Sequence, residues 1–295
     1  MNKQPLILFS LALIGLYVCS CGSPEPATST DKLTEETPTS TDQKERNYTP
    51  GEGWELVWAD EFDADTLNLN NWNRQIVRAG RFNDEWQRYT DSGSNAYIDS
   101  GHLVIRANHE SEDHGMDQYT SARLNTANKQ SWTYGKIAAR IRLPQGQGIW
   151  PAFWMLGANI NENGGDTPWP QCGEIDILEL YGSKDDGVVE SNLHYADATD
   201  NHTMSGAIPY KLEEGIFADD FHVFALEWTA DSITWLVDEN QYASAPITAD
   251  DMTEFHQDYF ILLNLAVGGT YAGRPGATTR FPQRMYVDWV RVYEK

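Results

Sequence analysis

From Trp54 to the end of the chain, apolar and polar residues alternate in short segments. Most segments carry Val, Ile, Trp or Tyr at every second position and are bounded by Gly, Pro, Asn or Asp. A period of two puts successive side chains on opposite faces of an extended strand, so each segment predicts a half-buried β-strand. The predicted strands are residues 54–62, 102–109, 134–144, 174–180, 222–228, 232–240, 259–267 and 285–294.

Helical patterns are scarce in the same region. No stretch shows a sustained helical stripe with caps at both ends, and residues 247–258 (ITADDMTEFHQD) are the best candidate for a short helical turn. Many short strands without alternating helices predict an all-β fold, a single jelly-roll β-sandwich. We expect the strand at Trp54 and the last strand of the chain to be neighbours in it.

The N-terminus has a different pattern. Lys3 precedes an apolar run of about a dozen residues, which suits the core of a signal peptide and is too short to span a membrane. The run ends at Ser20-Cys21-Gly22, which resembles the lipobox of bacterial lipoproteins, whose cysteine is acylated after cleavage. Residues 1–21 are therefore predicted to be a lipoprotein signal peptide with Cys21 as the lipidated residue; an ordinary secretory signal is the alternative. Either kind of signal predicts an exported protein, and a lipoprotein signal peptide predicts a protein that is lipid-anchored to a bacterial membrane.

Residues 22–50 are rich in Ser, Thr, Pro and Glu and contain almost no large apolar side chain. Such a segment cannot bury enough surface to fold, so we interpret it as a disordered linker. The folded domain is then predicted to be residues 51–295. Within it Cys172 is the only cysteine, and beside Gly173 it is expected to be a small buried residue.

The composition restricts the partners. A formal net charge of -23 argues against nucleic acid and anionic membrane surfaces, and suits a neutral ligand. The chain has 11 Trp and 14 Tyr, more than a core requires. Aromatic faces stack on sugar rings, although most of these residues are expected to fill the core. No Gly-rich phosphate loop precedes a helix, so no nucleotide cofactor is predicted. We expect a monomer.

Three acids in the segment GEIDILELYG carry the candidate chemistry. Glu174 and Asp176 are two apart and share one face of a strand, whereas Glu179, five after Glu174, should point to the other face. A β-bulge, one extra residue at Ile177 or Leu178, would return Glu179 to the face of the other two. Glu174 and Glu179 could then serve as the two carboxyl groups of a glycoside hydrolase, one as nucleophile and the other as proton donor, with Asp176 separating their pKa values. The alternatives are a calcium site or a solvated acidic strand, but calcium favours flexible loops.

The same segment resembles the signature of glycoside hydrolase family 16, in the bulged form E-x-D-x-x-E of laminarinases, the endo-1,3-β-glucanases. Lichenase-type members are similar but lack the extra residue. Further segments resemble family blocks in the family's order and extend the likeness over nearly all of residues 51–295: WADEF, FNDEWQRYT, YTSARLNT, YGKIAARIRLPQGQGIWPAFWML, FHVFALEWT, LNLAVGG and FPQRMYVDWVRVY. The resemblance implies a concanavalin A-like sandwich with a concave substrate cleft, and retaining hydrolysis of β-1,3-glucan by double displacement.

The resemblance also implies roles for single residues. Glu174 would be the nucleophile, Asp176 its assistant and Glu179 the general acid/base. Glu85 and Gln87 are at least as well interpreted as structural. Six further residues would contact a bound glucan: Asn83, Arg123, Trp150, Trp154, Trp169 and His194. Trp154 could instead belong to the core, and His194 could instead be structural.

A structural calcium ion on the convex side is common in the family. The resemblance implies Asp288 as its side-chain ligand, with backbone carbonyls near Glu61 and Gly101, and it implies no cofactor for catalysis. Three functions remain open at this point. They are a β-1,3-glucanase, a hydrolase of mixed-linkage glucan or marine galactan with the same mechanism, and a glycan-binding lipoprotein without catalysis, which the three intact acids argue against.

Overall fold

The structure, a computed structural model, describes residues 48–111, 116, 118–205 and 208–295. The predicted signal peptide, the predicted lipidation site Cys21 and nearly all of the predicted linker lie outside the described residues. Within the described residues, no helix is long and apolar enough to cross a membrane.

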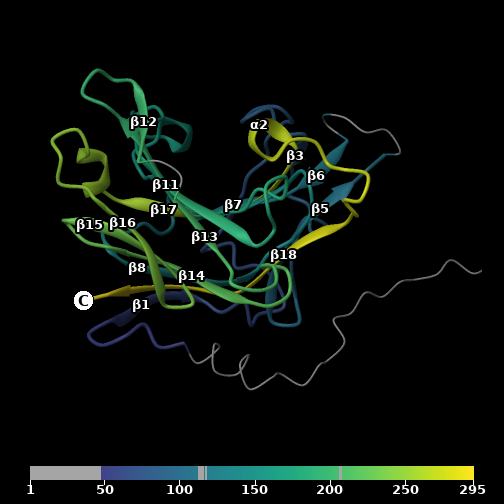
Figure 1. Cartoon of the computed structure of the whole chain (residues 1–295), viewed down its shortest axis with the longest axis horizontal. Helices are drawn as coiled ribbons and strands as arrows, with labels where there is room; N and C mark the ends of the chain where they lie inside the picture. Colours follow the sequence, from purple (N-terminus) through teal and green to yellow (C-terminus); the bar gives the residue numbers. More distant parts are fainter. Residues whose placement is uncertain (1–47, 112–115, 117, 206–207) are drawn as a thin grey trace, which may run out of the picture. The chain divides into compact units, whose positions relative to one another are not determined.

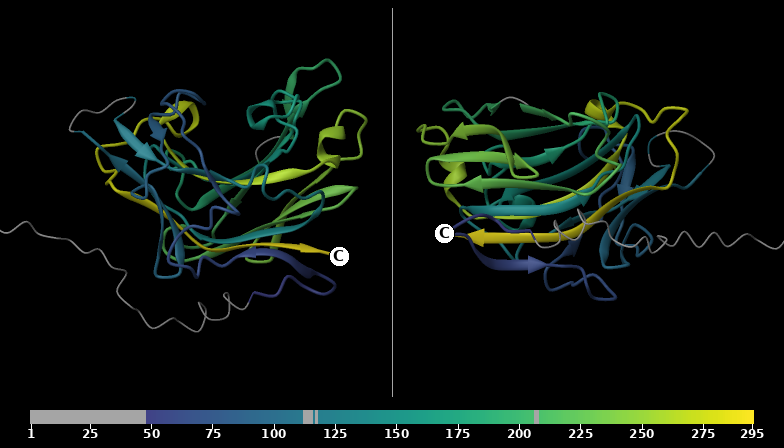
Figure 2. Two further views of the ribbon diagram at one scale, coloured as in Figure 1. Left: turned by 180° about the vertical axis from the view of Figure 1, so that it is seen from behind. Right: turned by 60° about the horizontal axis from the view of Figure 1, so that its bottom comes forward.

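Two β-sheets packed face to face form the body (Figures 1 and 2). The outer sheet has the order β16-β15-β14-β8-β18-β5-β6-β3, with β1 beside β18 and β4 beside β5. Its strands are β1 (Glu55–Asp60), β3 (Gln87–Tyr89), β4 (Ala96–Asp99), β5 (His102–His109), β6 (Tyr119–Ser121), β8 (Gly135–Arg142), β14 (His222–Trp228), β15 (Ser232–Val237), β16 (Asn240–Pro246) and β18 (Gln283–Glu294).

The second sheet, here called the cleft sheet, has the order β12-β11-β10-β9-β17-β7-β2, with β13 beside β11. Its strands are β2 (Asn73–Arg74), β7 (Arg123–Asn125), β9 (Ile149–Gly157), β10 (Glu174–Glu179), β11 (Val188–Ala196), β12 (His202–Met204), β13 (Ile208–Lys211) and β17 (Tyr259–Val267). The fold is the predicted all-β jelly-roll sandwich, and β1 pairs with β18 as expected.

The alternation seen in the sequence divides each strand between core and surface. On β8, Ile137, Ala139 and Ile141 enter the main hydrophobic core between the sheets, while Lys136 and Arg140 point to the outer face. Of the described residues, only three short segments are helical: η1 (Asn161–Asn163), η2 (Thr253–His256) and α2 (Gly269–Ala272). The helical turn expected within residues 247–258 is η2.

Residues 48–50, just before the predicted boundary at residue 51, contact the folded body. The Tyr48 ring packs on Trp289 with 5.2 Å between ring centroids, and its hydroxyl donates to Glu239 at 2.5 Å. The Pro50 carbonyl accepts a hydrogen bond of 3.0 Å from Nζ of Lys136, a fully buried side chain. Residues 48–50 therefore belong to the folded body, because they cover a buried charge and an aromatic ring.

We expect a chain starting at residue 51 to be less stable than one starting at residue 48, by about 2 kcal/mol in the free energy of unfolding. The loss combines one aromatic contact with one hydrogen bond to a buried ammonium group. Urea unfolding of the two fragments measures it. Tyr48→Phe in the longer fragment keeps the ring contact and should lose less, and equal stability of the two fragments would return the boundary to residue 51.

Candidate active site

The predicted bulge is present on β10. Asp176 pairs with Asn192 and Glu179 with Glu190, so β10 advances by three residues where β11 advances by two. The same shift appears against β9. Ile177 and Leu178 are consecutive and both buried in the core, because the extra residue lets neighbouring side chains point the same way. Glu179 is thereby returned to the face of Glu174 and Asp176.

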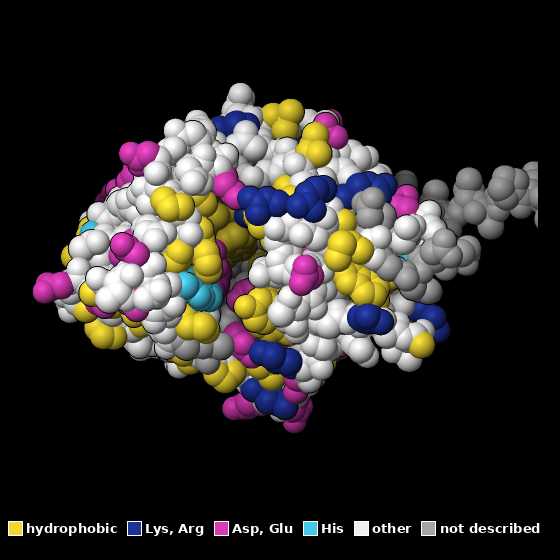
Figure 3. Space-filling view, turned by 90° about the horizontal axis from the view of Figure 1, so that it is seen from above, with side chains coloured by type: hydrophobic (Ala, Val, Ile, Leu, Met, Phe, Trp, Pro, Cys, Tyr) yellow, Lys and Arg dark blue, Asp and Glu magenta, His cyan; other side chains and the backbone are white. Residues whose placement is uncertain are grey.

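All nine residues predicted to act on or bind the substrate line one cavity of about 560 Å³ on the cleft sheet. Figure 3 shows a hollow across this face, bordered by hydrophobic and charged side chains. On β9 the residues two apart, Trp150, Ala152 and Trp154, face it, as strand periodicity requires. The structure therefore brings the predicted residues together, and Trp154 faces the cleft.

Glu174 and Glu179 are held differently. Glu174 accepts a hydrogen bond of 3.1 Å from Nε1 of Trp169, which lies at the edge of the cavity with 44% of its surface exposed. Glu179 accepts two bonds, 2.9 Å from Nε1 of Trp150 and 2.8 Å from the hydroxyl of Tyr181. Each carboxyl group is thus fixed in position by an indole, which preorganises it for reaction.

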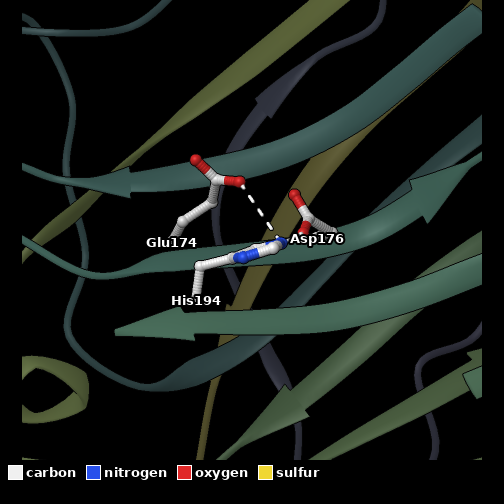
Figure 4. Close-up of side chains that lie close together, drawn as sticks. All are labelled: Glu174, Asp176 and His194. Carbon is white, nitrogen blue, oxygen red and sulfur yellow. Dashed lines mark ion pairs between the residues drawn. The ribbon is translucent and has the colours of Figure 1, made fainter. Parts of the chain in front are cut away.

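Asp176 lies between them and is 2% exposed. Its Oδ2 has no hydrogen bond from a described residue but is 3.3 Å from Nε2 of His194, which is also 3.8 Å from Oε1 of Glu174 (Figure 4). Nε2 of His194 thus faces both carboxyl groups and is also 3.1 Å from Nδ2 of Asn192, so His194 compensates part of their charge when it is protonated. The three atoms lie within 4.8 Å of one another and could also hold a metal ion, but hydrolysis would use the same atoms.

His194 is itself bound by a second histidine that the sequence analysis missed. Nδ1 of His194 is 2.8 Å from Nε2 of His202, and the two rings stack at 18°. The His202 ring also lies 4.6 Å from the Trp169 ring. Burial and the neighbouring His194 lower the pKa of His202, which favours a neutral ring. Only the pairing of β11 with β12, Ala196 opposite His202, brings this residue to the site.

Burial dominates the electrostatics of the three acids. Burial, reinforced by the charge of Asp176, raises the pKa of Glu174 to about 8 and that of Glu179 to about 8. Burial raises the pKa of Asp176 to about 8 as well. Asp176 is buried and Glu174 and Glu179 are partly buried, so the raised pKa values favour retention of protons by the cluster at neutral pH. This is the state required of a site that pairs an acid with a nucleophile.

The raised pKa values carry a cost in stability. A carboxyl group whose pKa rises on folding binds its proton more tightly in the folded state, so stability falls as pH rises from about 4.5 to about 8. We expect Glu179→Gln to be more stable than the parent at pH 8, by about 1–3 kcal/mol, and no more stable at pH 4. Urea unfolding at both pH values tests this, with the exposed Glu213→Gln as the control. An unchanged stability at pH 8 would refute the desolvation of Glu179.

The remaining predicted residues lie on the β7 side of the acids. Arg123 lies between two rings, with its Cζ 4.5 Å from Trp154 and 4.9 Å from Phe82, and its Nε donates to Gln75 at 2.6 Å. Trp154 donates from Nε1 to Asn264 at 2.7 Å.

Asn83 lines the same cavity, and its carbonyl accepts from the backbone N–H of Thr270. Glu85 also lines the cavity, and the contacts of Glu85 and Gln87 fit the structural interpretation given above. Both are buried, with 2.6 Å between Nε2 of Gln87 and Oε2 of Glu85.

The backbone brings the three predicted calcium positions together. Asp288 lies on β18 where pairing with β5 ends and pairing with β1 begins, and Gly101 and Glu61 directly flank those two strands. However, Oδ2 of Asp288 accepts a 2.8 Å hydrogen bond from the buried Arg140, and Oδ1 is 3.6 Å from Nε2 of His102. Strand pairing brings the three positions near one another, whereas the carboxylate of Asp288 is already paired with a cation. The site stays a prediction.

Comparisons with known proteins identify the family of the chain. The model of the family "Glycosyl hydrolases family 16" matches residues 83–291. The chain belongs to glycosyl hydrolases family 16. A β-glucanase of Rhodothermus marinus is 39% identical over 252 residues, which cover 81% of this chain and 85% of that protein.

Solved structures of the family superimpose on the chain. The laminarinase catalytic domain of Thermotoga maritima is 42% identical, with a TM-score of 0.71, covering 83% of this chain and 99% of that one. A LamA structure from Zobellia galactanivorans in complex with laminaritriose and laminaritetraose is 32% identical, with a TM-score of 0.72, covering 81% of this chain and 98% of that one. This family 16 member is therefore a glycoside hydrolase with the jelly-roll fold of laminarinases.

Proposed function

We propose that this protein hydrolyses β-1,3-glucan internally by a retaining double displacement. The observation that carries the proposal is the bulged row Glu174–Asp176–Glu179, which lines a single cavity together with aromatic side chains. The laminarinase and β-glucanase relatives support the choice of glucan.

In the first step Glu174 attacks the anomeric carbon and Glu179 protonates the departing glycosidic oxygen. The result is a covalent glycosyl-enzyme and a released chain end. In the second step Glu179, now ionised, takes a proton from water, which attacks the anomeric carbon and frees Glu174. Asp176 and His194 lie beside the nucleophile, and a protonated His194 would compensate the negative charge of Glu174 as it leaves in the second step.

The charges of the cavity favour a neutral polymer. Among the described residues, the cavity is lined by six acids and three Lys or Arg side chains. Two of those basic side chains are paired with acids, Arg81 with Glu162 at 2.8 Å and Lys184 with Glu190 at 2.7 Å. The third, Arg123, lies between aromatic rings. A sulfated galactan would meet net negative charge here, so we infer an uncharged glucan.

Release of reducing sugar from laminarin, lichenan and agarose by residues 48–295 tests this function. We expect laminarin to be the best substrate, with early products of many sizes. Preference for lichenan would indicate a mixed-linkage glucanase, and preference for agarose a galactanase. Binding of laminarin without hydrolysis would indicate a glycan-binding protein and would end the proposal of catalysis.

We also propose that the protein is exported and anchored through a lipid on Cys21, which the lipobox-like segment supports.

We further propose a calcium ion at Asp288, which the convergence of β1, β5 and β18 supports. Since the calcium position lies on the outer sheet, away from the acids, we expect chelation to lower the melting temperature without abolishing activity. An unchanged melting temperature would exclude calcium, and mass spectrometry of the mature N-terminus tests the lipid.

A further inference from the structure

An ion pair lies at the β7 side of the catalytic cavity. Nη2 of Arg81 is 2.8 Å from Oε1 of Glu162, and both residues line the cavity that contains the acids. Their side chains are 50% and 38% exposed, so the pair lies at the surface of the cleft and not beneath it.

The two residues come from opposite ends of the strands. The segment that carries Arg81 is bonded to the end of β17, where Trp86 donates to the carbonyl of Val267 at 2.7 Å. Glu162 belongs to η1, which follows Gly157 of β9, and Gly157 pairs with Tyr259 at the start of β17. Eight residue steps separate the two ends of β17, about 26 Å at 3.3 Å per residue. The ion pair therefore joins two segments that are attached near opposite ends of β17.

Both sides of the bridge are held in place. On one side, Gly80 donates to the carbonyl of Glu85 at 2.8 Å, which closes the turn that presents Arg81. On the other side, Asn128 donates from its side chain to the carbonyl of Asn163 at 2.9 Å. The pair therefore joins two ordered segments, and opening it requires little more than rotation of two side chains.

The bridge stands at a distance from the acids. Phe82, next to Arg81, packs on Arg123 of β7, and three strand spacings separate β7 from β10, about 14 Å at 4.8 Å each. A glucan chain bound over the acids and running toward β7 thus reaches the bridge after a few sugar rings. With the pair closed the chain has to end there, and with the pair open it continues.

We propose that the Arg81–Glu162 pair is a specificity-determining strap: internal attack on a long glucan requires the pair to open, so losing the pair makes internal attack easier. This inference rests on the proposed function, because it assumes that the chain in the cleft is a glucan. The strap consists of the side chains of Arg81 and Glu162 alone. Its loss should change where a polymer is cut and leave the chemistry at the acids unchanged.

The test compares Arg81→Ala and Glu162→Ala with the parent on laminarin and on a short aryl β-glucoside. On laminarin, both variants should give longer early products and a faster fall in viscosity per reducing end, by about two- to fivefold, the effect of losing one exposed ion pair. The rate on the aryl glucoside should stay unchanged. The reversed pair, Arg81→Glu with Glu162→Arg, should restore the parental product sizes.

Lys211→Ala is the matched control, because it breaks an exposed ion pair of 2.9 Å with Asp185 outside the cavity. Parental product sizes in both single variants would overturn the strap while laminarin hydrolysis, and hence the proposed function, stands. Equal losses on polymer and aryl glucoside would also overturn it, since they indicate a general structural role. A parent enzyme that does not cut laminarin would instead refute the proposed function.

Discussion

Azide is expected to restore turnover of Glu179→Ala and of Glu174→Ala on an activated aryl β-glucoside, with opposite anomers as products. Without azide both variants should lose about 10³-fold or more in turnover of laminarin, because each lacks one of the two groups that the reaction needs. The two products differ because the variants fail at different steps.

In Glu179→Ala the nucleophile is intact and the activated leaving group needs little protonation, so the glycosyl-enzyme forms. No base then activates water, and azide attacks the intermediate to give the β-glycosyl azide. In Glu174→Ala a space opens beneath the anomeric carbon, and azide entering there gives the α-glycosyl azide in one displacement. NMR of the product anomers distinguishes the two results.

Asp176→Asn is the matched control, since it keeps the shape of the side chain and removes its charge. It should lower turnover less than either alanine variant, because Asp176 adjusts the acids without bonding to the sugar. The β-azide from Glu174→Ala together with the α-azide from Glu179→Ala would reverse the assignment. Net inversion in the native reaction would reject the retaining mechanism.

The strands and the acid row could be predicted because both depend on local periodicity. Alternation indicates a half-buried strand. The spacing of five between Glu174 and Glu179 puts the two side chains on opposite faces of a regular strand, unless a bulge lies between them. Tyr181 was missed although the same rule could have found it, as it lies two residues beyond Glu179 and donates to it. Its signal was present in the sequence.

Other parts of the site had no local signal. His202 reaches His194 only through the pairing of β11 with β12, and Arg81 meets Glu162 only because two segments 81 residues apart meet over the cleft sheet. Such contacts depend on strand order and loop conformation. The contact of Tyr48 with the folded body had no local signal either, since a lone Tyr in a polar segment does not indicate the buried Lys136 that it helps to cover.

Deleting both Ile177 and Leu178 is expected to abolish activity, whereas deleting Leu178 alone should leave measurable activity. Without Leu178 the strand reads E-I-D-I-E, and Glu179 stays on the face of Glu174 by plain alternation. Without both residues it follows Asp176 directly, so its carboxylate turns toward the core, where an unpaired charge is costly.

The two deletions also remove buried side chains, so loss of activity has to be separated from loss of folding. Leu178→Ala is the matched control, because it removes a core side chain, at a cost of about 2–5 kcal/mol, and keeps the register of Glu179. It should lower the melting temperature and retain activity at temperatures where it is folded. Circular dichroism and thermal melting establish which variants are folded, and reducing-sugar release from laminarin measures their activity. Full activity of the double deletion would refute the bulge as the feature that aligns the acids. Loss of activity in a folded Leu178 deletion would show that alternation alone cannot position Glu179, and that the bulge also sets its distance from Glu174.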